Sequence, residues 1–91
     1  MRVIRSISEM QEWTTVERSA GHSVGFVPTM GALHQGHAEL FSRSVSENKR
    51  TVVSIFVNSL QFNSVSDLEA YPRQLEQDKV IAEQQSVDVL F

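Results

Sequence analysis

The sequence predicts an α/β domain built around a parallel β-sheet. Two hydrophobic patterns alternate along its 91 residues: short runs rich in apolar and β-branched residues, and longer segments with apolar residues at helical spacing. Because the helical segments lie between strand-like runs, we expect right-handed crossovers and a Rossmann-like sheet with helices on both faces. With 41% apolar and 21% charged residues, the composition is that of one small globular domain.

The first part of the chain predicts a strand, a helix and a second strand. Residues 2–5 are a short strand candidate. Ser6 and Glu9 then form an S-x-x-E capping box, which is typical of a helix start, and Gly21 is expected to end that helix. Residues 23–28 (S-V-G-F-V-P) are rich in β-formers and are interpreted as a buried strand.

The middle of the chain predicts a second helix and the strongest strand of the sequence. The helix is expected over residues 37–47, with Asn48 as its stop. Its apolar stripe consists of Leu40, Phe41 and Val45. Residues 51–57 (T-V-V-S-I-F-V) are almost continuously apolar, which suits a central parallel strand covered on both faces.

The last part of the chain predicts a third helix and a final strand. The helix is expected over residues 72–85, because proline suits a first helical turn, and the strand over residues 87–91. Arg73 and Asp78 are expected to lie on the helix surface rather than to act as a functional pair. Because the chain stops within a hydrophobic strand-like run, residues 1–91 are interpreted as the amino-terminal, truncated portion of a longer domain.

Composition excludes several classes of function. A net charge of −3 offers no basic face for a nucleic-acid backbone, so no nucleic-acid partner is expected. The lack of cysteine excludes disulfides and thiolate metal sites. The amino terminus lacks the apolar core of a secretion signal, and no apolar run approaches the ~20 residues of a membrane span. We therefore expect a cytoplasmic protein without a membrane partner.

The loop after the second strand carries the most informative residues. It reads P-T-M-G-A-L-H-Q-G-H over residues 28–37, and ligands of open α/β sheets bind at the carboxyl ends of strands. Gly31 can adopt backbone angles closed to other residues, and Gly36 lets a ligand approach the main chain. His34 and His37 lie side by side if one helical turn includes both. Two imidazoles at the positive end of a helix suit a polyphosphate.

Less specific interpretations of these histidines compete with a phosphate site. A single loop histidine is usually solvated or structural. A metal site is not expected, because no third His, Cys or carboxylate lies nearby at zinc-ligand spacing. The order strand, glycine loop, H-x-G-H and helix is similar to the HxGH nucleotidyltransferases, in which both imidazoles contact phosphates. The combination therefore favours a nucleotide-binding domain.

Three longer strings resemble the pantoate–β-alanine ligase (pantothenate synthetase) family. They are P-T-M-G-A-L-H-Q-G-H (residues 28–37), S-I-F-V-N-S-L-Q-F (residues 54–62) and D-L-E-A-Y-P-R (residues 67–73). The spacing between them also fits, and the resemblance covers nearly the whole chain. Ser59 departs from the family, which usually has proline there, so we expect a less rigid loop rather than a lost site.

The resemblance implies an ATP-dependent ligase that joins pantoate to β-alanine through a pantoyl-adenylate intermediate, with Mg²⁺ accompanying ATP. The implied ATP site consists of Met30, Gly31, Ala32, Leu33, His34, Gln35, Gly36 and His37. His34 and His37 are the implied catalytic residues, and His37 is the usual candidate for proton donor. Gln61 is implied to bind pantoate and then β-alanine, assisted by Asn58. The family is typically homodimeric through this domain.

Two alternatives remain open on the sequence alone. The chain could belong to another HxGH nucleotidyltransferase, such as a cytidylyltransferase, or it could be a non-catalytic module for dimerisation or ligand binding. The family's further ATP-binding lysine and arginine residues lie in segments beyond residue 91. We therefore expect the 91-residue chain alone to be inactive.

Overall fold

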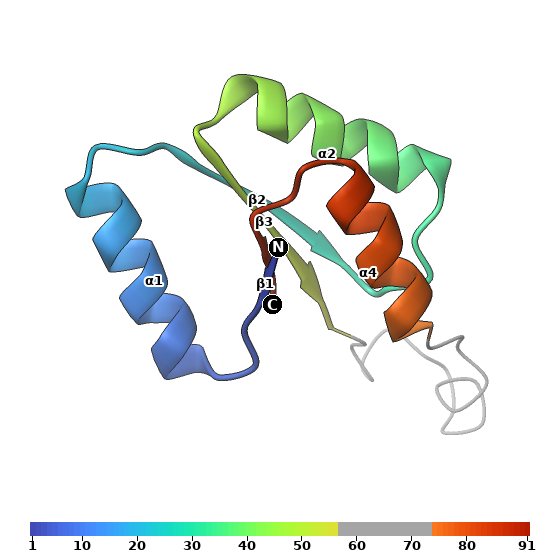
Figure 1. Cartoon of the computed structure of the whole chain (residues 1–91), viewed down its shortest axis with the longest axis horizontal. Helices are drawn as coiled ribbons and strands as arrows, with labels where there is room; N and C mark the ends of the chain where they lie inside the picture. The colour runs from blue at the N-terminus through green and yellow to red at the C-terminus, as the bar shows by residue number, and fades with distance from the viewer. Residues whose placement is uncertain (57–73) are drawn as a thin grey trace, which may run out of the picture.

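The computed structural model describes residues 1–56 and 74–91, which form a parallel β-sheet flanked by helices (Figure 1). The strands are β1 (Arg2–Val3), β2 (Val24–Thr29), β3 (Arg50–Ile55) and β4 (Val89–Leu90), and the helices are α1 (Ile7–Ser19), α2 (Gln35–Glu47) and α4 (Leu75–Gln84). The α/β class and the parallel sheet predicted from the sequence are confirmed. Outside the described residues lie Val57, Asn58, Gln61 and the string over residues 67–73, with Pro72.

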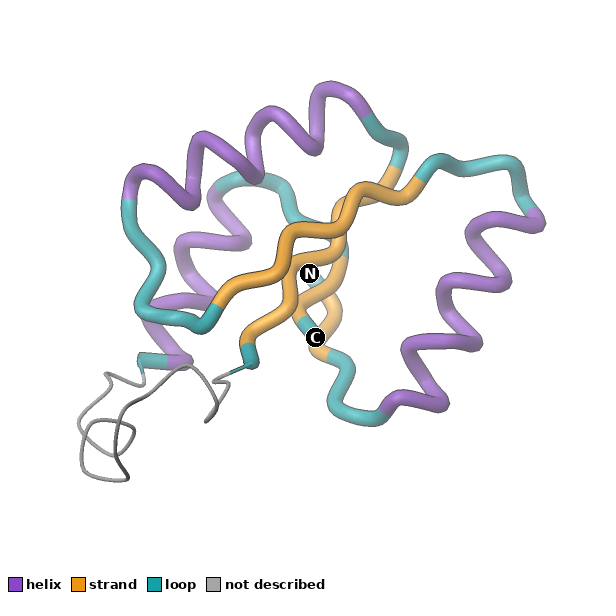
Figure 2. The backbone as a smooth tube through the Cα atoms, turned by 180° about the vertical axis from the view of Figure 1, so that it is seen from behind, coloured by secondary structure: helices purple, strands orange, loops and turns teal. Residues whose placement is uncertain are grey.

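The strand order is β1-β4-β3-β2, and every described pair is parallel. The last strand, β4, lies between β1 and β3, so the two ends of the chain meet in the middle of the fold (Figures 1 and 2). β3 is central, with β2 and β4 on its two sides, and its residues 51–54 are all buried. This confirms the prediction of a strand covered on both faces.

β2 is an edge strand among the described residues, and the prediction of a buried strand was wrong. It pairs only with β3, and Phe26 in its middle is 58% exposed. Thr29 is its one buried residue. An edge position explains why Pro28 is tolerated there, because proline donates no hydrogen bond to a neighbouring strand.

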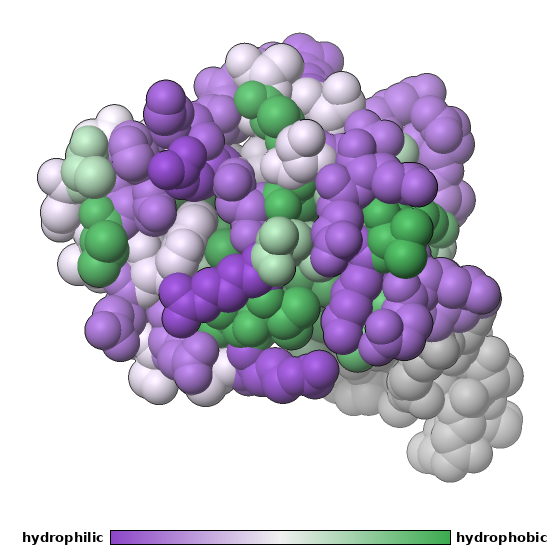
Figure 3. Space-filling view, in the orientation of Figure 1, coloured by the Kyte–Doolittle hydropathy of each residue, from purple (hydrophilic) through white to green (hydrophobic). Residues whose placement is uncertain are grey.

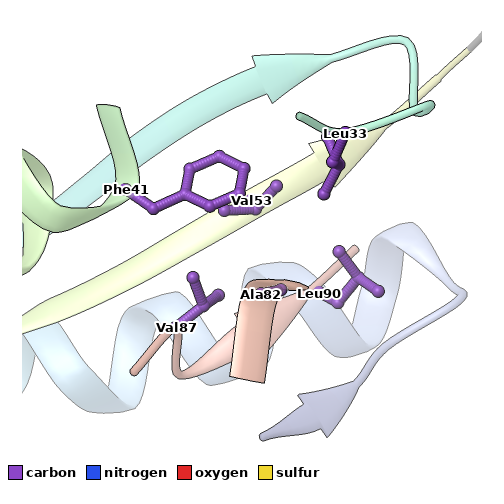
Figure 4. Packing of buried hydrophobic residues seen from close by; sticks show 6 residues of the cluster. All are labelled: Leu33, Phe41, Val53, Ala82, Val87 and Leu90. Atoms are coloured by element: carbon purple, nitrogen blue, oxygen red, sulfur yellow. The ribbon is translucent and has the colours of Figure 1, made fainter. Parts of the chain in front are cut away.

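Two apolar layers sandwich the sheet. On one face the side chains converge between α2, α4 and the strands (Figure 4), where the buried residues are Leu33, Phe41, Val53, Ala82, Val87 and Leu90. On the other face Met10 and Trp13 of α1 pack against the buried Ile4, Val52 and Val89. The view from behind also shows α1 well separated from α2 and α4 (Figure 2). Helices therefore cover both faces, as predicted.

The ends of α1 follow the sequence signals. The Ser6 hydroxyl accepts a hydrogen bond from the Glu9 N–H at 3.2 Å, which caps the first turn. The helix ends at Ser19, and Gly21 follows with φ of +80°, a left-handed angle that glycine adopts without steric cost. None of the described helices has the length and apolar character needed to cross a membrane.

α2 differs from the prediction at its start and on one face. It begins at Gln35, two residues before the predicted His37, because the His34 side chain caps it. Leu40, predicted in the apolar stripe, is 54% exposed, whereas Phe41 is fully buried. The inward face also carries Ser44, which hydrogen-bonds to Thr51 of β3 at 2.8 Å. The buried face of α2 includes a polar residue, so the pattern of apolar residues in the sequence did not identify that face correctly.

Glycine permits the close approach of α2 to the sheet. A Cβ atom at Gly25 would lie 2.6 Å from Asn48 Nδ2 and would also collide with Ser44 Oγ. The Asn48 amide in turn donates to the Ser44 carbonyl at 3.2 Å. The small residue in β2 therefore sets how closely α2 packs, and with it the position of the loop that joins the two elements.

Candidate functional site

The candidate site is the loop between β2 and α2, at the carboxyl end of the sheet. Thr29, the last residue of β2, attaches the start of the loop to β3. Its hydroxyl donates to the Ser54 carbonyl at 2.9 Å and accepts from the Gly31 N–H at 3.2 Å. The Phe56 N–H also donates to the Thr29 carbonyl at 2.9 Å. The loop is thus held where open α/β sheets place their ligands.

The loop backbone takes two consecutive left-handed conformations. Gly31 has φ of +85° and Ala32 has φ of +51°. A Cβ atom at Gly31 would approach Ile55 Cγ2 to 3.1 Å and Asp78 Oδ2 to 3.2 Å, so tight space adds to the backbone angle in favouring glycine. Ala32 bears the strain of a left-handed residue with a side chain, and such strain concentrates at functional sites.

Asp78 of α4 anchors this strained loop, which corrects the expectation that it lies on the helix surface. Its side chain is 2% exposed, and its carboxylate accepts hydrogen bonds from the Ala32 N–H at 3.1 Å and the Leu33 N–H at 2.8 Å. One signal in the sequence was available: Asp78 lies four residues before the apolar Ala82, which places both on one face of the helix. The structure shows that this face is the inward one. Arg73 lies outside the described residues.

His34 and His37 meet at the amino terminus of α2, as predicted. Their ring centroids lie 4.2 Å apart. His34 Nδ1 accepts from the Gly36 N–H at 3.1 Å, and His37 Nδ1 accepts from the His34 N–H at 3.2 Å. A histidine thus performs the capping role usually taken by Ser, Thr, Asp or Asn. Because histidine is an unusual N-cap residue, the sequence pattern predicted the helix start two residues too late, at His37.

These bonds determine which ring nitrogens can donate. An Nδ1 atom that accepts from a backbone N–H cannot carry a proton, so in the neutral form of each ring the proton resides on Nε2. Burial lowers the pKa of His37 below its usual value, the neighbouring His34 lowers it further, and the Asp78 carboxylate opposes the shift. His37 is therefore held as a neutral Nε2–H donor near neutral pH.

A cavity of about 360 Å³ lies beside the loop, at the carboxyl ends of the strands. It is lined by Val3, Ile4, Arg5, Met30, Gly31, Ile55, Gln74, Leu75, Asp78, Leu90 and Phe91. Apolar surface is open to view near the centre of the molecule in Figure 3, bordered by hydrophilic residues. Met30 and Gly31 are the two predicted ATP-site residues that line this cavity, and Arg5 brings a cation to it.

The structure divides the other predicted residues by environment. The Leu33 side chain is 7% exposed and belongs to the core, so a ligand can reach this residue only through its backbone. Gln35 and Gly36 are exposed beside His34. Gly36 lies close to the His34 ring: a Cβ atom at Gly36 would approach His34 Cε1 to 3.0 Å. Asn58 and Gln61 lie outside the described residues, so their predicted roles stay predictions.

The arrangement can bind an anion through several converging hydrogen-bond donors. Two imidazole N–H groups, the exposed amino-terminal turn of α2 and its positive dipole end converge on one place. Among residues 1–56 and 74–91, no group of three or more His, Cys, Asp or Glu residues is placed to hold a metal ion. Both oxygens of the Asp78 carboxylate already accept backbone N–H groups.

Comparison with known protein families shows which family the chain belongs to. The family model described as pantoate–β-alanine ligase matches residues 2–91. The chain belongs to the pantoate–β-alanine ligase family. It is 52% identical over 90 residues to the pantothenate synthetase of Staphylococcus haemolyticus, covering 99% of this chain and 32% of that protein. It is 53% identical over 91 residues to the pantothenate synthetase of Brucella anthropi, covering 100% of this chain and 32% of the relative.

Solved structures of the pantoate–β-alanine ligase family share this fold. The pantothenate synthetase of Thermus thermophilus matches with a TM-score of 0.83 and 44% identity, covering 100% of this chain and 31% of that one. The ligase of Francisella tularensis, solved in complex with "beta-gamma ATP" and β-alanine, matches with a TM-score of 0.84 and 44% identity, covering 100% of this chain and 34% of the other. The chain therefore spans about a third of the length of the relatives it matches.

Proposed function

We propose that the protein carrying this chain condenses pantoate with β-alanine at the expense of ATP, giving pantothenate, AMP and pyrophosphate. The observation that carries the proposal is the pair of adjoining imidazoles at the amino terminus of α2, in a chain of the pantoate–β-alanine ligase family. The Francisella relative in complex with an ATP ligand and β-alanine supports the choice of substrates.

The proposed reaction has two steps. A carboxylate oxygen of pantoate attacks the α-phosphorus of ATP, forming pantoyl adenylate as the bond to pyrophosphate breaks. The amine of β-alanine then attacks the pantoyl carbonyl carbon, and AMP leaves as the amide forms and the amine loses a proton. The first step joins two anions, so the site must stabilise the charge that grows on the departing pyrophosphate.

We assign that stabilisation to His34 and His37. Their Nε2–H groups donate to phosphate oxygens, while their Nδ1 atoms stay engaged with backbone N–H groups. Preorganised donors of this kind each contribute roughly 10²–10³ in rate. The lowered pKa of His37 disfavours its protonated form near neutral pH, so the ring acts there through the hydrogen bond that its Nε2–H donates.

The rest of the predicted ATP site then separates into two roles. Met30, Gly31, Gln35 and Gly36 offer surface to the nucleotide. Ala32 and Leu33 shape the loop, because their N–H groups are already donated to Asp78. The family resemblance further assigns pantoate to Gln61, with help from Asn58. Mg²⁺ enters as part of the MgATP substrate, held by the phosphates.

Histidine-to-alanine variants of the full-length protein test the proposal. We expect His34→Ala and His37→Ala each to slow pantoate-dependent pyrophosphate release by roughly 10²–10³. His22→Ala is the matched control, because His22 is also hydrogen-bonded but lies at the far side of the fold, bound to Glu17 at 2.6 Å. Urea unfolding of all three variants measures the structural cost.

Activity losses that merely follow losses of stability, with His22→Ala indistinguishable from the other two, would show that the histidine pair is structural. Pyrophosphate release with other carboxylic acids but not with pantoate would indicate a different adenylating enzyme. We also propose that the 91-residue chain by itself releases no pyrophosphate, and that the full protein is a homodimer, as the exposed Phe26 on edge strand β2 favours.

A further inference from the structure

Asp78 is a buried carboxylate that links two distant parts of the chain. It lies 45 residues after Leu33 in the sequence, yet it accepts the Leu33 N–H at 2.8 Å and the Ala32 N–H at 3.1 Å. Within residues 1–56 and 74–91, no lysine, arginine or histidine lies within ion-pair distance of it. Burial of a carboxylate is costly, so these two backbone donors must offset the cost.

The two hydrogen bonds act on the strained part of the loop. Gly31 and Ala32 both have left-handed backbone angles, with φ of +85° and +51°. A left-handed backbone angle is sterically disfavoured for a residue with a side chain, so the loop would relax toward ordinary angles without an opposing interaction. A carboxylate that accepts two adjacent N–H groups supplies that interaction.

The anchored segment leads directly to the histidine pair. Leu33 precedes His34, and the N–H of His34 donates to His37 Nδ1 at 3.2 Å. A movement of the Leu33 N–H therefore displaces the His34 backbone, and with it the bond that orients the His37 ring. The same carboxylate acts electrostatically on His37, because it raises the pKa of that ring while burial and His34 lower it. Among the described residues, His34 and Asp78 are the titratable groups that act on His37.

We propose that Asp78 is a positioning residue of the ATP site: it holds the loop that presents His34 and His37 to the phosphates of the nucleotide. The inference rests on the proposed function for the identity of the ligand. Asp78 does not need to touch the nucleotide, because both of its oxygens are occupied by N–H groups and its side chain is 2% exposed.

The test is Asp78→Asn in the full-length protein. An asparagine has one acceptor oxygen, and its NH₂ group would face a backbone N–H, so at least one anchor bond is lost. Asp88→Asn is the matched control, because Asp88 also accepts a backbone N–H, that of Thr51 at 2.7 Å, at the opposite end of β3. Both variants lose a carboxylate-to-backbone bond, but only Asp78 holds the loop.

Calorimetric titration with MgATP and with pantoate, at a temperature where both variants are folded, gives the readout. Asp78→Asn is expected to weaken ATP binding by about tenfold to a hundredfold, with pantoate affinity within about threefold of wild type. Asp88→Asn is expected to leave both affinities within about twofold of wild type. An Asp78→Asn protein that loses stability as Asp88→Asn does, and binds ATP as wild type does, overturns the inference.

Two further measurements keep the outcomes separate. NMR titration of the His37 ring is expected to show a lower pKa in Asp78→Asn and no change in Asp88→Asn, and an unchanged His37 pKa in both contradicts the proposed coupling. If Asp78→Asn does not fold, Asp78→Glu retains two acceptors, and weakened ATP binding with intact pantoate binding is then expected; unaltered ATP affinity refutes the inference. Failure of the wild-type protein to bind ATP would refute the proposed function instead.

Discussion

A methyl group at Gly31 should lower the stability of the fold and, if the loop forms the proposed ATP site, the affinity for ATP. Gly31→Ala forces a left-handed angle on a residue with a side chain, which costs about 1–2 kcal/mol. The new Cβ would also lie 3.1 Å from Ile55 Cγ2 and 3.2 Å from Asp78 Oδ2, closer than ordinary van der Waals contact. Such overpacking adds roughly 1–3 kcal/mol.

Gly21→Ala provides a control that isolates the second cost. Gly21 has φ of +80°, close to that of Gly31, but a Cβ there meets nothing within 4 Å. Both substitutions also restrict the unfolded chain in the same way, so that contribution cancels in the comparison. We expect Gly21→Ala to lower the free energy of unfolding by about 1 kcal/mol and Gly31→Ala by about 2–4 kcal/mol.

Urea unfolding and calorimetric titration with MgATP on the full-length variants measure the two effects. The methyl group added in Gly31→Ala must displace the loop, the Ile55 side chain or the Asp78 carboxylate, and the left-handed angle strains the loop in any case. We therefore expect ATP affinity to fall by at least about tenfold in that variant. We expect it to stay unchanged in Gly21→Ala. Equal losses of stability and equal ATP affinities in the two variants would refute the claim that space around Gly31 matters.

Two other substitutions test the scaffold beneath the site. Gly25→Ala should lower the free energy of unfolding by roughly 1–3 kcal/mol or more, because its Cβ would collide with Ser44 Oγ; a urea midpoint equal to that of wild type would contradict this. The Glu17 carboxylate, which accepts from His22 Nδ1 and Arg50 Nε, has a pKa lowered chiefly by the His22 hydrogen bond. The ionised Glu17 carboxylate therefore stabilises the folded state fully above about pH 4.5, the usual pKa of a glutamate. This contribution is lost as the pH falls through the lowered pKa of Glu17 in the folded protein. Glu17→Gln should flatten the decline of urea midpoints below that pH, and an unaltered decline would count against the assignment.

Most secondary-structure elements could be predicted because their signals are local. The Ser6 cap, the helix stop at Gly21 and the strand-forming run over residues 51–57 each depend on neighbouring residues. The structure confirms the cap and the stop, and it has the strand over Arg50–Ile55. The errors arose where the deciding partner is distant. Leu40 is apolar but exposed, and Ser44 is polar but buried, because Thr51 of β3 supplies a hydrogen bond that a hydrophobicity pattern does not register.

The placement of the strands shows the same limit. The sequence contains the run that becomes β4, but nothing local places it between β1 and β3. That position depends on parallel pairing across most of the chain, with Arg2 and Val52 both opposite Val89. The edge position of β2, which leaves Phe26 exposed, likewise follows from the strand order.

The amino-acid sequence by itself determined the α/β class, the glycine loop and the adjacency of His34 and His37, because residues three apart at a helix start, the N-cap and the third helical residue, bring their side chains together. Only the tertiary structure decided how that loop is held. The carboxylate of Asp78 is brought to the Ala32 and Leu33 N–H groups by the packing of α4 against the sheet, over a separation of 45 residues from Leu33. A buried charge accepts backbone donors wherever the fold places them, so its partners could not be identified from spacing along the chain.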